Sequence, residues 1–404
     1  MRDVRALHEW VRAHRDELVD DLGRYVGLET PSTDRPLLDA GLSWLDGWLR
    51  ARLGEPSSVR VTHGGDFGDV HVYDYAGSGA DPVLLLCHYD TVWPQGTLAG
   101  WPFTVDGDRA TGPGVFDMKA GLVQVVWALR ALEAAGLPRP PVRLVLNGDE
   151  EIGSPVSRPV IEDAASGVQA ALVFEAAADG AVKTARKGVG IYRITATGVE
   201  AHAGLDPGKG ASAVDEIARM VLALHGLTDL QAGTTVNVGV VSGGSRGNVI
   251  AGSASGEVDV RVSSAAEAAR IEAALTGLTA HDVRASVSVE GGWNRPVMER
   301  SEGIASLFSL AQGLAAELGV TLRECAVGGA SDGNFVAAMG LPVLDGFGAL
   351  GDGAHARHEH ISVEGMLERS ALAAAVLHAL AFPNAARGNA GGWSAAGEEG
   401  ASPR

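Results

Sequence analysis

The chain has 404 residues, of which 46% are hydrophobic and 20% charged, so it is long enough for two domains with sizeable cores. Its formal net charge of −18 argues against a nucleic-acid-binding protein, although a few arginines in a cleft could still bind a small anion. With two cysteines, Cys87 and Cys325, and no apolar run of about 18 residues, the sequence predicts neither a disulfide framework nor a membrane span.

The first 26 residues carry apolar side chains on one helical face and charges on the other. This pattern predicts a helix over 4–26 that stops before Gly27. The segment lacks the apolar core of a signal peptide, so we expect a soluble cytoplasmic protein. A second helix is predicted over 38–53, ending at Gly54.

Strands and helices then alternate. The sequence predicts strands over 59–62, 69–75 and 83–87, a helix over 121–135, and strands over 142–147 and 170–174. This alternation is typical of an α/β fold with a largely parallel sheet at its centre.

The pattern changes near Lys187. The next predicted elements are a strand (191–197), a helix (211–224), two strands (235–241 and 256–262), a helix (265–275) and a strand (284–290). This β-α-β-β-α-β order indicates a small open-faced α+β sandwich inserted into the first domain. From about residue 296 the α/β pattern resumes, with helices over 304–318 and 366–381. We therefore expect a first domain in two parts (1–186 and 296–383), an inserted domain (187–295) and a disordered Gly/Ala/Ser-rich tail (384–404).

Histidines and carboxylates follow the predicted buried strands. His88 and Asp90 come directly after strand 83–87, Glu151 follows strand 142–147, and Glu175 follows strand 170–174. Ligands of α/β folds bind at the carboxyl ends of strands, so these groups are candidate ligands. Because a metal-binding histidine commonly donates its second ring N–H to a carboxylate, His88 is the candidate metal ligand and Asp90 its partner.

Three more residues extend this group. Asp117 lies in a glycine-flanked turn before helix 121–135, where a carboxylate can bridge two cations or simply cap the helix. Neighbouring carboxylates repel one another unless positive charge lies among them. Glu151 on a metal ion, with its neighbour Glu150 as general base, would satisfy this condition. His355, in a late His-rich loop, adds another imidazole. Each position alone could be a turn or a cap, but together they predict a site for zinc, or for cobalt or manganese.

Three motifs carry a resemblance to a known superfamily: HYDTV at 88–92, GPGVFDMKAG at 112–121 and DEEIGS at 149–154. They resemble the dinuclear zinc metallopeptidases that include aminoacylase, succinyl-diaminopimelate desuccinylase and glutamate carboxypeptidase. The match runs in order from about residue 18 to 380, and 89–103 is most similar to the bacterial glutamate carboxypeptidase branch. The resemblance implies a zinc-exopeptidase-like catalytic domain, with the inserted sandwich as a lid and dimerisation domain.

The resemblance also implies a ligand set for two Zn²⁺ ions. Asp117 would bridge the ions, with His88 and Glu175 on one ion and Glu151 and His355 on the other. Glu150 would be the general base. The pattern H-x-x-x-E selects His355 over His358 and His360, because Glu359 lies four residues after His355.

The substrate-binding residues implied by the resemblance lie later in the chain. His202 resembles a lid-domain histidine that reaches into the active site of the partner subunit, Asn248 a substrate-contacting asparagine, and Arg295 an arginine that binds the substrate's α-carboxylate. Gly329 and Ser331 belong to a loop, 328–334, that resembles a substrate-side glycine-rich loop. The alternatives without a role in substrate binding are a loop cap for His202, a turn for Asn248 and a solvated hinge charge for Arg295. The functional interpretation predicts a homodimer.

The sequence departs from the superfamily pattern in two places. Cys87 stands where glycine is usual before the first metal histidine, and a thiol there could ligate zinc or simply pack. Ala330 and Asn334 are variations in the substrate-side loop, so side-chain specificity is left open.

The predicted function is metal-dependent hydrolysis of an amide bond next to a free carboxylate, in a small peptide-like or N-acyl amino acid substrate. A glutamate carboxypeptidase-like activity is the first interpretation. The alternatives are an N-acyl-amino-acid deacylase, a dipeptidase or a biosynthetic amidohydrolase on the same scaffold. A protein of another class, a non-catalytic metal-binding member, is disfavoured by the intact Glu150.

Overall fold

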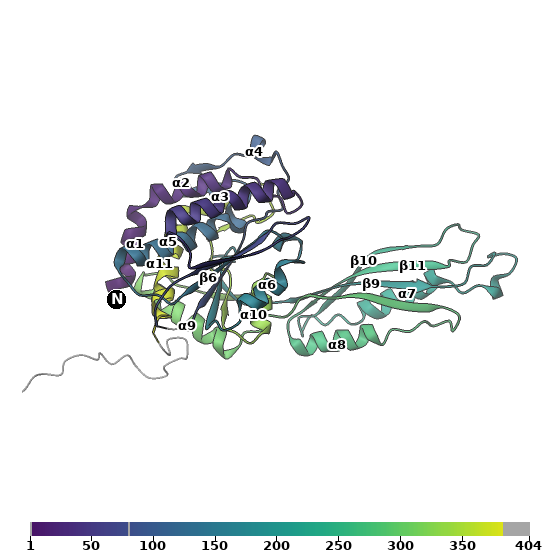
Figure 1. Cartoon of the computed structure of the whole chain (residues 1–404). Helices are drawn as coiled ribbons and strands as arrows, with labels where there is room; N and C mark the ends of the chain where they lie inside the picture. The colour runs from purple at the N-terminus through teal and green to yellow at the C-terminus, as the bar shows by residue number, and fades with distance from the viewer. Residues whose placement is uncertain (1, 80, 383–404) are drawn as a thin grey trace, which may run out of the picture.

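The computed structural model describes all residues except 1, 80 and 383–404. The predicted disordered tail, 384–404, therefore lies outside the described residues. The chain forms a larger lobe from its N- and C-terminal parts and an elongated smaller lobe from the middle of the chain (Figure 1). We call these the main lobe and the inserted lobe (188–295).

The main lobe is built on a six-stranded sheet of order β1-β2-β6-β3-β7-β14. Its strands are β1 (Ser58–Thr62), β2 (Val70–Tyr75), β3 (Val83–His88), β6 (Val142–Asn147), β7 (Ala170–Val173) and β14 (Val343–Leu344). Strands β6, β3, β7 and β14 are mutually parallel, whereas β1 and β2 are antiparallel additions at one edge. The predicted α/β fold with a largely parallel centre is confirmed.

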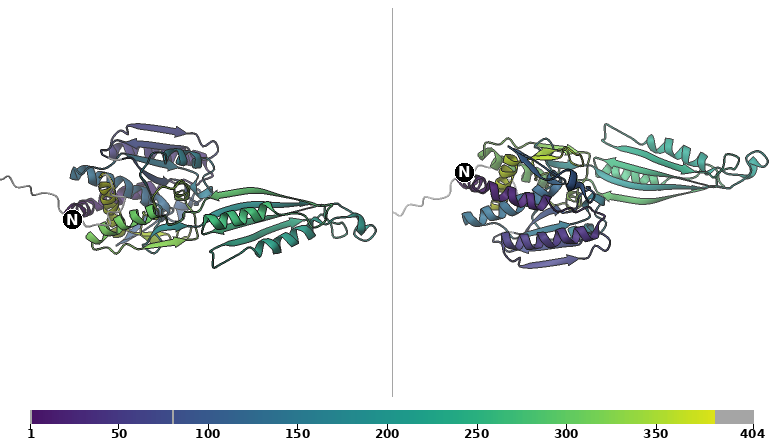
Figure 2. Two further views of the ribbon diagram at one scale, coloured as in Figure 1. Left: turned by 90° about the horizontal axis from the view of Figure 1, so that it is seen from below. Right: turned by 90° about the horizontal axis from the view of Figure 1, so that it is seen from above.

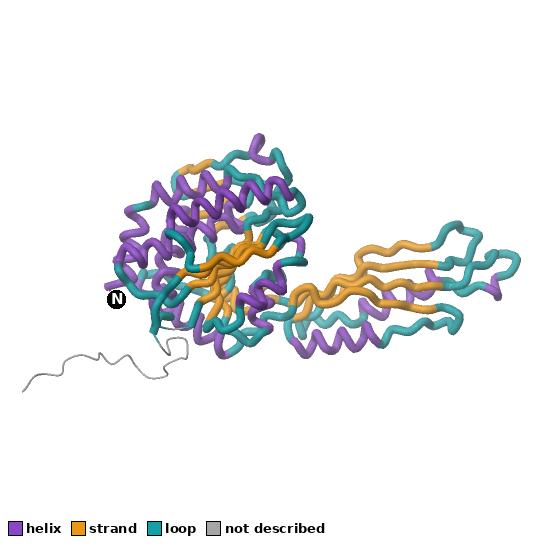
Figure 3. The backbone as a smooth tube through the Cα atoms, viewed as in Figure 1, coloured by secondary structure: helices purple, strands orange, loops and turns teal. Residues whose placement is uncertain are grey.

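Helices cover both faces of this sheet (Figures 1 and 3). They are α1 (Arg2–Ala13), α2 (Arg15–Val26), α3 (Arg35–Leu53), α5 (Ala120–Ala135), α6 (Ser157–Ala164), α9 (Glu302–Glu317), α10 (Gly333–Ala338) and α11 (Val363–Ala379). Alternate residues of β3 point to opposite faces, so Leu85 packs in the core under α1, α2, α3, α5 and α11. Leu84 and Leu86 pack in a second core with residues of α6 and α10.

The single helix predicted over 4–26 is wrong in one respect, because the structure breaks it at His14 into α1 and α2. The His14 ring lies with Nδ1 2.8 Å from the carbonyl oxygen of Trp10. A side chain bonded to a nearby backbone group competes with the regular helical ladder, which accounts for the break.

Several short elements had no signal in the sequence pattern. They are α4 (Thr97–Gly100), η1 (Val115–Lys119), η2 (Glu150–Ile152), a sheet of β15 (Gly351–Asp352), β16 (His360–Ser362), β5 (Arg109–Thr111) and β4 (Thr104–Asp106), and the parallel pair β8 (Val182–Arg186) and β13 (Glu324–Val327). Most are too short for a period to emerge, yet β15 and β16 form the hairpin whose loop carries His355.

The inserted lobe is a four-stranded antiparallel sheet of order β10-β11-β9-β12 with two helices on one face (Figures 1 and 2). Its elements are β9 (Gly188–Thr197), η3 (Pro207–Lys209), α7 (Ala213–His225), β10 (Thr235–Gly243), β11 (Ser253–Val262), α8 (Ala265–Thr276) and β12 (Ser286–Arg295). The predicted open-faced α+β sandwich is confirmed. No helix among the described residues of either lobe has the length and apolar character needed to cross a membrane.

Gly121 allows the start of α5 to approach the end of β7. A Cβ atom at this position would lie 2.0 Å from the backbone oxygen of Phe174, the residue before Glu175. At Gly47, in the exposed middle of α3, a Cβ atom would have no other atom within 4 Å. The two glycines therefore occupy helices for different reasons.

We expect Gly121→Ala to lower the free energy of unfolding by about 1–3 kcal/mol, because the new methyl group must displace backbone. The matched Gly47→Ala change should raise it by about 0.4–1 kcal/mol, because alanine restricts the unfolded chain without a clash. Urea unfolding of the two variants and the wild type measures both effects. A Gly121→Ala protein as stable as the wild type would contradict this close helix–strand contact.

Candidate metal centre

The parallel strands bring the predicted ligands to one edge of the sheet. His88 ends β3, Glu175 follows β7, and Glu150 and Glu151 lie in η2 after β6. Because β6, β3 and β7 are neighbours and parallel, their carboxyl ends meet at the same edge. Asp117 enters from η1, so four segments of the main lobe converge here.

Two histidines lie on opposite sides of the Asp117 carboxylate. His88 Nε2 is 3.2 Å from Asp117 Oδ1 and 3.4 Å from Glu175 Oε1. His355 Nε2 is 3.4 Å from Asp117 Oδ2 and 3.0 Å from Glu151 Oε2. Each carboxylate oxygen of Asp117 thus belongs to a different donor set, which we call the His88 set and the His355 set.

These spacings match those of ligand atoms around one cation. Zinc ligands lie at about 2.0–2.1 Å from the ion, so two ligand atoms of a tetrahedral site are roughly 3.3 Å apart. The nitrogen–oxygen separations in both sets lie between 3.0 and 3.4 Å. Imidazole nitrogen with carboxylate oxygen is also a donor combination that zinc accepts.

The electrostatics of the cluster call for positive charge. Burial raises the pKa of Glu150 well above its usual value and that of Glu151 to about 7. Burial alone would raise the pKa of Asp117, but hydrogen bonds from His355 and His88 lower it. Hydrogen bonds to Asp117 and Glu151 raise the pKa of His355 to about 10. The carboxylates and imidazoles of the cluster thus favour positive charge among them, which bound cations would supply.

One buried carboxylate oxygen of the cluster lacks a hydrogen-bond partner within the described part of the chain. Glu151 Oε1 is buried and has no hydrogen-bond partner among the described residues. A buried carboxylate oxygen without a partner is costly, and coordination to a cation would satisfy it. The donor sets therefore fit the metal ions that the sequence predicts.

Asp90 connects the His88 set to the loop of the candidate base. His88 Nδ1 lies 3.0 Å from the backbone oxygen of Asp90 and 3.4 Å from its Oδ1. The Asp90 carboxylate in turn accepts hydrogen bonds from Ser32 Oγ at 2.7 Å and from the backbone N–H groups of Glu150 and Glu151 at 3.2 Å. One buried carboxylate thus orients both the histidine ring and η2.

The structure also separates alternatives that the sequence left open. Asp117 does not cap α5, since that helix has no side-chain cap. Among the three late histidines, His355 lies at the cluster, whereas the ring of His360 turns back to the carbonyl of His358. Cys87 is buried, and burial raises the pKa of its thiol, as expected of a packed cysteine.

Arg295 lies at the junction of the two lobes and is only 3% exposed. From the end of β12, its Nη2 donates to Ser154 Oγ at 2.8 Å and to Asp332 Oδ1 at 3.1 Å, and lies 3.3 Å from Glu150 Oε1. The predicted carboxylate-binding arginine is thus next to the candidate base and already bonded to carboxylates of the protein.

The predicted glycine-rich loop lies beside a second ion-pair network. Arg186 forms a two-pronged pair with Asp345 at 2.6 and 2.8 Å and donates to the backbone oxygen of Gly329 at 3.2 Å. The Ser331 hydroxyl donates to Asp345 and is fully buried. Of the two predicted loop residues, only Gly329 is exposed.

The sequence interpretation missed two cations on β8. Lys183 is 9% exposed, and its Nζ makes no hydrogen bond or ion pair within the described part of the chain. Burial lowers the pKa of Lys183, while Asp345 and Glu175 lie close enough to raise it. Arg186 Nη2 is 3.9 Å from Glu175 Oε2. Two cations three residues apart in the short segment after Glu175 were the signal that could have identified them.

His202 and Asn248 lie in the inserted lobe, away from the cluster. His202 Nδ1 accepts hydrogen bonds from the backbone N–H groups of Gly204 and Leu205 at 3.1 Å, and His202 pairs with Val249. Strand β9 has 10 residues and so carries the chain roughly 33 Å from the junction before His202 is reached. Within the described residues, no hydrogen bond or ion pair joins either residue to the donor sets.

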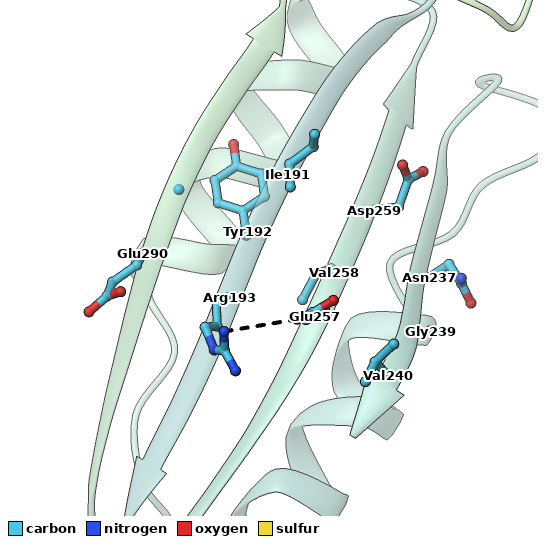
Figure 4. A pocket seen from close by; sticks show the side chains of 11 residues that line it. Ile191, Tyr192, Arg193, Asn237, Gly239, Val240, Glu257, Val258, Asp259 and Glu290 are labelled. Carbon is cyan, nitrogen blue, oxygen red and sulfur yellow. Dashed lines mark ion pairs between the residues drawn. The ribbon is translucent and has the colours of Figure 1, made fainter. Parts of the chain in front are cut away.

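A hollow of about 540 Å³ lies on the open face of the inserted lobe's sheet (Figure 4). Its lining comes from β9, β10, β11 and β12 and includes the ion pair of Arg193 with Glu257. None of the predicted site residues lines it, so the chemistry is assigned to the cluster on the main lobe.

Comparison with known proteins agrees with this geometry. The profile of the Peptidase family M20/M25/M40 matches residues 84–379. Carboxypeptidase G2 of Pseudomonas sp. (strain RS-16) is 30% identical over 370 residues, which cover 89% of this chain and 88% of that protein.

Solved structures share the fold. Aminopeptidase PepT from Bacillus cereus ATCC 10987 superposes with a TM-score of 0.72 at 20% identity, covering 91% of this chain and 99% of that one. The M20 family metallo-carboxypeptidase Sso-CP2 from Sulfolobus solfataricus gives 0.67 at 16% identity, with 90% and 99% covered. The chain therefore belongs to the Peptidase family M20/M25/M40 and is a metal-dependent hydrolase of peptidase type.

Proposed function

We propose that this protein is a dinuclear zinc carboxypeptidase that hydrolyses an amide bond next to a free carboxylate, with glutamate as the preferred leaving residue. The observation that carries the proposal is the pair of donor sets on the two oxygens of Asp117, beside the carboxylate of Glu150, whose side chain is 13% exposed. The similarity to carboxypeptidase G2 over most of both chains supports the choice of reaction.

Two bound zinc ions would supply Lewis acidity and lower the pKa of water towards about 7. Glu150 is the group that moves the proton. Because burial raises its pKa, the Glu150 carboxylate can accept a proton from the attacking water and then donate it to the leaving nitrogen. Arg295 Nη2, 3.3 Å away, holds the carboxylate in place.

Positive groups near the cluster suit a substrate with two carboxylates. Arg295 is proposed to bind the α-carboxylate, since the guanidinium presents paired donors that match a carboxylate, and Asn248 would join it from a second copy of the chain. Lys183, buried beside Glu175 and without an ion pair among the described residues, is a second cation for an acidic side chain. Gly329 and Ser331 would shape the nearby pocket wall.

The proposal is tested by hydrolysis of a panel of N-acyl glutamates, N-acyl norleucine, N-acetyl amino acids and dipeptides, with and without chelator. We expect chelator-sensitive release of glutamate. In Lys183→Met, kcat/KM for N-acyl glutamate should fall roughly 10–100-fold, the loss expected for a hydrogen bond to a charged group, while N-acyl norleucine is unaffected.

The control for charge is Lys187→Met, which removes the same charge from a half-buried side chain without an ion pair among the described residues. Equal losses on both substrates in Lys183→Met would contradict the acidic pocket. Preference for dipeptides or N-acetyl amino acids would agree with metal-dependent amide hydrolysis but contradict the preference for glutamate. No turnover with two zinc ions bound would favour a binding protein.

Glu150→Gln keeps the size of the side chain but removes its ability to accept a proton. We expect kcat to fall roughly 10²–10⁴-fold, the range typical of lost general acid–base catalysis, with zinc content and substrate KM close to wild type. Steady-state kinetics with metal analysis by mass spectrometry measures this. Near-wild-type turnover with two zinc ions bound would contradict the role of Glu150.

We also propose that the protein works as a homodimer. His202 and Asn248 lie in loops at the end of the inserted lobe remote from the junction, too far to reach their own cluster in this arrangement. Exposed apolar side chains on the same lobe could cover a contact with a second copy, namely Leu205, Leu222, Leu230, Val240 and Val241. In such a dimer His202 would stabilise the oxyanion in the partner's site.

Subunit mixing tests this arrangement. His202→Ala and Glu150→Gln should each be inactive alone, but a heterodimer of the two would contain one site with both groups intact. After unfolding and refolding an equimolar mixture, we expect about a quarter of wild-type activity, since half of the dimers are mixed and each has one good site. No recovery, with dimers present by light scattering, would show that His202 does not act across the dimer.

A cytoplasmic location is proposed on the state of the cysteines. Cys87 and Cys325 are both free, and no disulfide is present among the described residues. Free thiols are typical of a reducing compartment. Fractionation of cells that express the protein would decide the compartment, and recovery in the secreted fraction would contradict the proposal.

A further inference from the structure

The loop between β15 and β16 carries a predicted metal ligand on the protein surface. The side chain of His355 is 52% exposed, and its backbone φ is 60°, in the left-handed region that few non-glycine residues adopt. Ala354, Arg357 and His358 on the same loop are exposed as well. The hydrophobic core does not hold this loop in place, so other contacts must do so.

Glu359 provides one anchor at the end of the loop. Its carboxylate is fully buried and accepts hydrogen bonds from the backbone N–H groups of Gly114, Phe116 and Asp117 at 2.8–3.1 Å. It also accepts from Trp93 Nε1 at 2.9 Å. The carboxylate therefore ties the His355 loop to the turn of Asp117 and to the segment after His88.

Arg357 provides a second anchor of a different kind. Its guanidinium carbon lies 5.2 Å from the ring centroid of Trp93 and 5.7 Å from that of Trp101. The two indoles meet edge to face, with centroids 5.0 Å apart and planes at 80°. Within the described residues the Arg357 side chain makes no hydrogen bond and no ion pair, and the two indoles are its cation–π partners.

The indoles are themselves fixed to the main lobe. Trp93 donates a hydrogen bond to Glu359. Trp101 directly follows α4, and the Glu29 carboxylate accepts hydrogen bonds from the backbone N–H groups of Gly96 and Leu98 at the start of this helix, at 2.7 and 2.8 Å. Arg357, two residues from His355, is thus gripped by segments that do not belong to its own loop.

We propose that Arg357 is a positioning residue: clamped by Trp93 and Trp101, it holds His355 in place for the second cation. The inference rests on the proposed two-ion function, because it needs an ion in the His355 set. An arginine suits the role because its planar guanidinium stacks on aromatic faces, which the ammonium group of lysine does less well.

The test is competition titration of the full-length protein with Zn²⁺ against a chromophoric chelator, which resolves the two affinities. In Arg357→Ala and Trp101→Ala we expect the weaker ion to bind roughly tenfold less tightly, the size of effect typical of residues that orient ligands. The tighter ion should be unaffected. Turnover should be lost at limiting zinc and return at saturating zinc, with KM unchanged.

Three variants sharpen the result. Trp101→Phe keeps an aromatic face and should retain most of the second-ion affinity, whereas Arg357→Lys keeps only the charge and should lose most of it. His358→Ala changes an exposed neighbour on the same loop and should behave as wild type. The double variant Arg357→Ala/Trp101→Ala should be no weaker than either single variant, because both changes remove one contact.

Other outcomes would overturn the proposal. An unchanged second affinity would do so, as would a higher KM without a change in zinc binding, which would make the indoles a substrate surface. Loss of both ions together with a lower Tm would show a merely structural role. A wild type that binds one ion overturns the clamp and the proposed function together. Two ions without turnover overturn the proposed function alone.

Discussion

The main constraint on this structure is the mutual repulsion of the carboxylates that meet at one edge of the central sheet. Asp117 from η1, Glu150 and Glu151 from η2, and Glu175 after β7 approach the same two imidazoles. Such a group is tolerated only if positive charge lies among its members. The parallel centre of the sheet provides the convergence, because three neighbouring strands end at this edge. Burial raises the pKa values of Glu150 and Glu151, and hydrogen bonds to the neighbouring carboxylates raise those of both histidines.

The junction with the inserted lobe is coupled to this site. Arg295 ends β12 of the inserted lobe, yet its guanidinium reaches Glu150, Ser154 and Asp332 of the main lobe. A movement of the inserted lobe would therefore pull directly on the loop of the candidate base. The same arginine is proposed to bind a substrate carboxylate, so substrate would exchange one carboxylate partner for another. Under that proposal, substrate binding and the position of the inserted lobe would be linked through Arg295.

The sequence predicted most of what depends on local periodicity and little of what depends on contacts between distant segments. His88 and Glu175 were predicted as ligands because each ends a buried apolar run, and those runs are strands in the structure. The break at His14 was missed because it arises from a side-chain bond to the backbone, which leaves the apolar stripe intact. The position of Lys183 was missed because it depends on pairing that leaves no periodic pattern: the chain turns back at the Ala178–Ala181 bridge, and the backbone of Lys183 pairs with that of Asp345, far along the chain.

The two donor sets differ in how the protein encloses them, and this difference has chemical consequences. The side chain of His88 is 2% exposed and that of His355 is 52% exposed, so one set lies inside the fold and the other at its surface. If two ions bind as proposed, one in the His88 set would lie among buried groups, whereas one in the His355 set would lie close to solvent. A ligand on a surface loop loses more conformational freedom when it binds, which weakens binding unless the loop is held beforehand. The four hydrogen bonds to Glu359 and the stacking of Arg357 are contacts that restrict this loop before any ion arrives. The His88 set is held by burial and by Asp90, whereas the exposed His355 set depends on the contacts of Glu359 and Arg357.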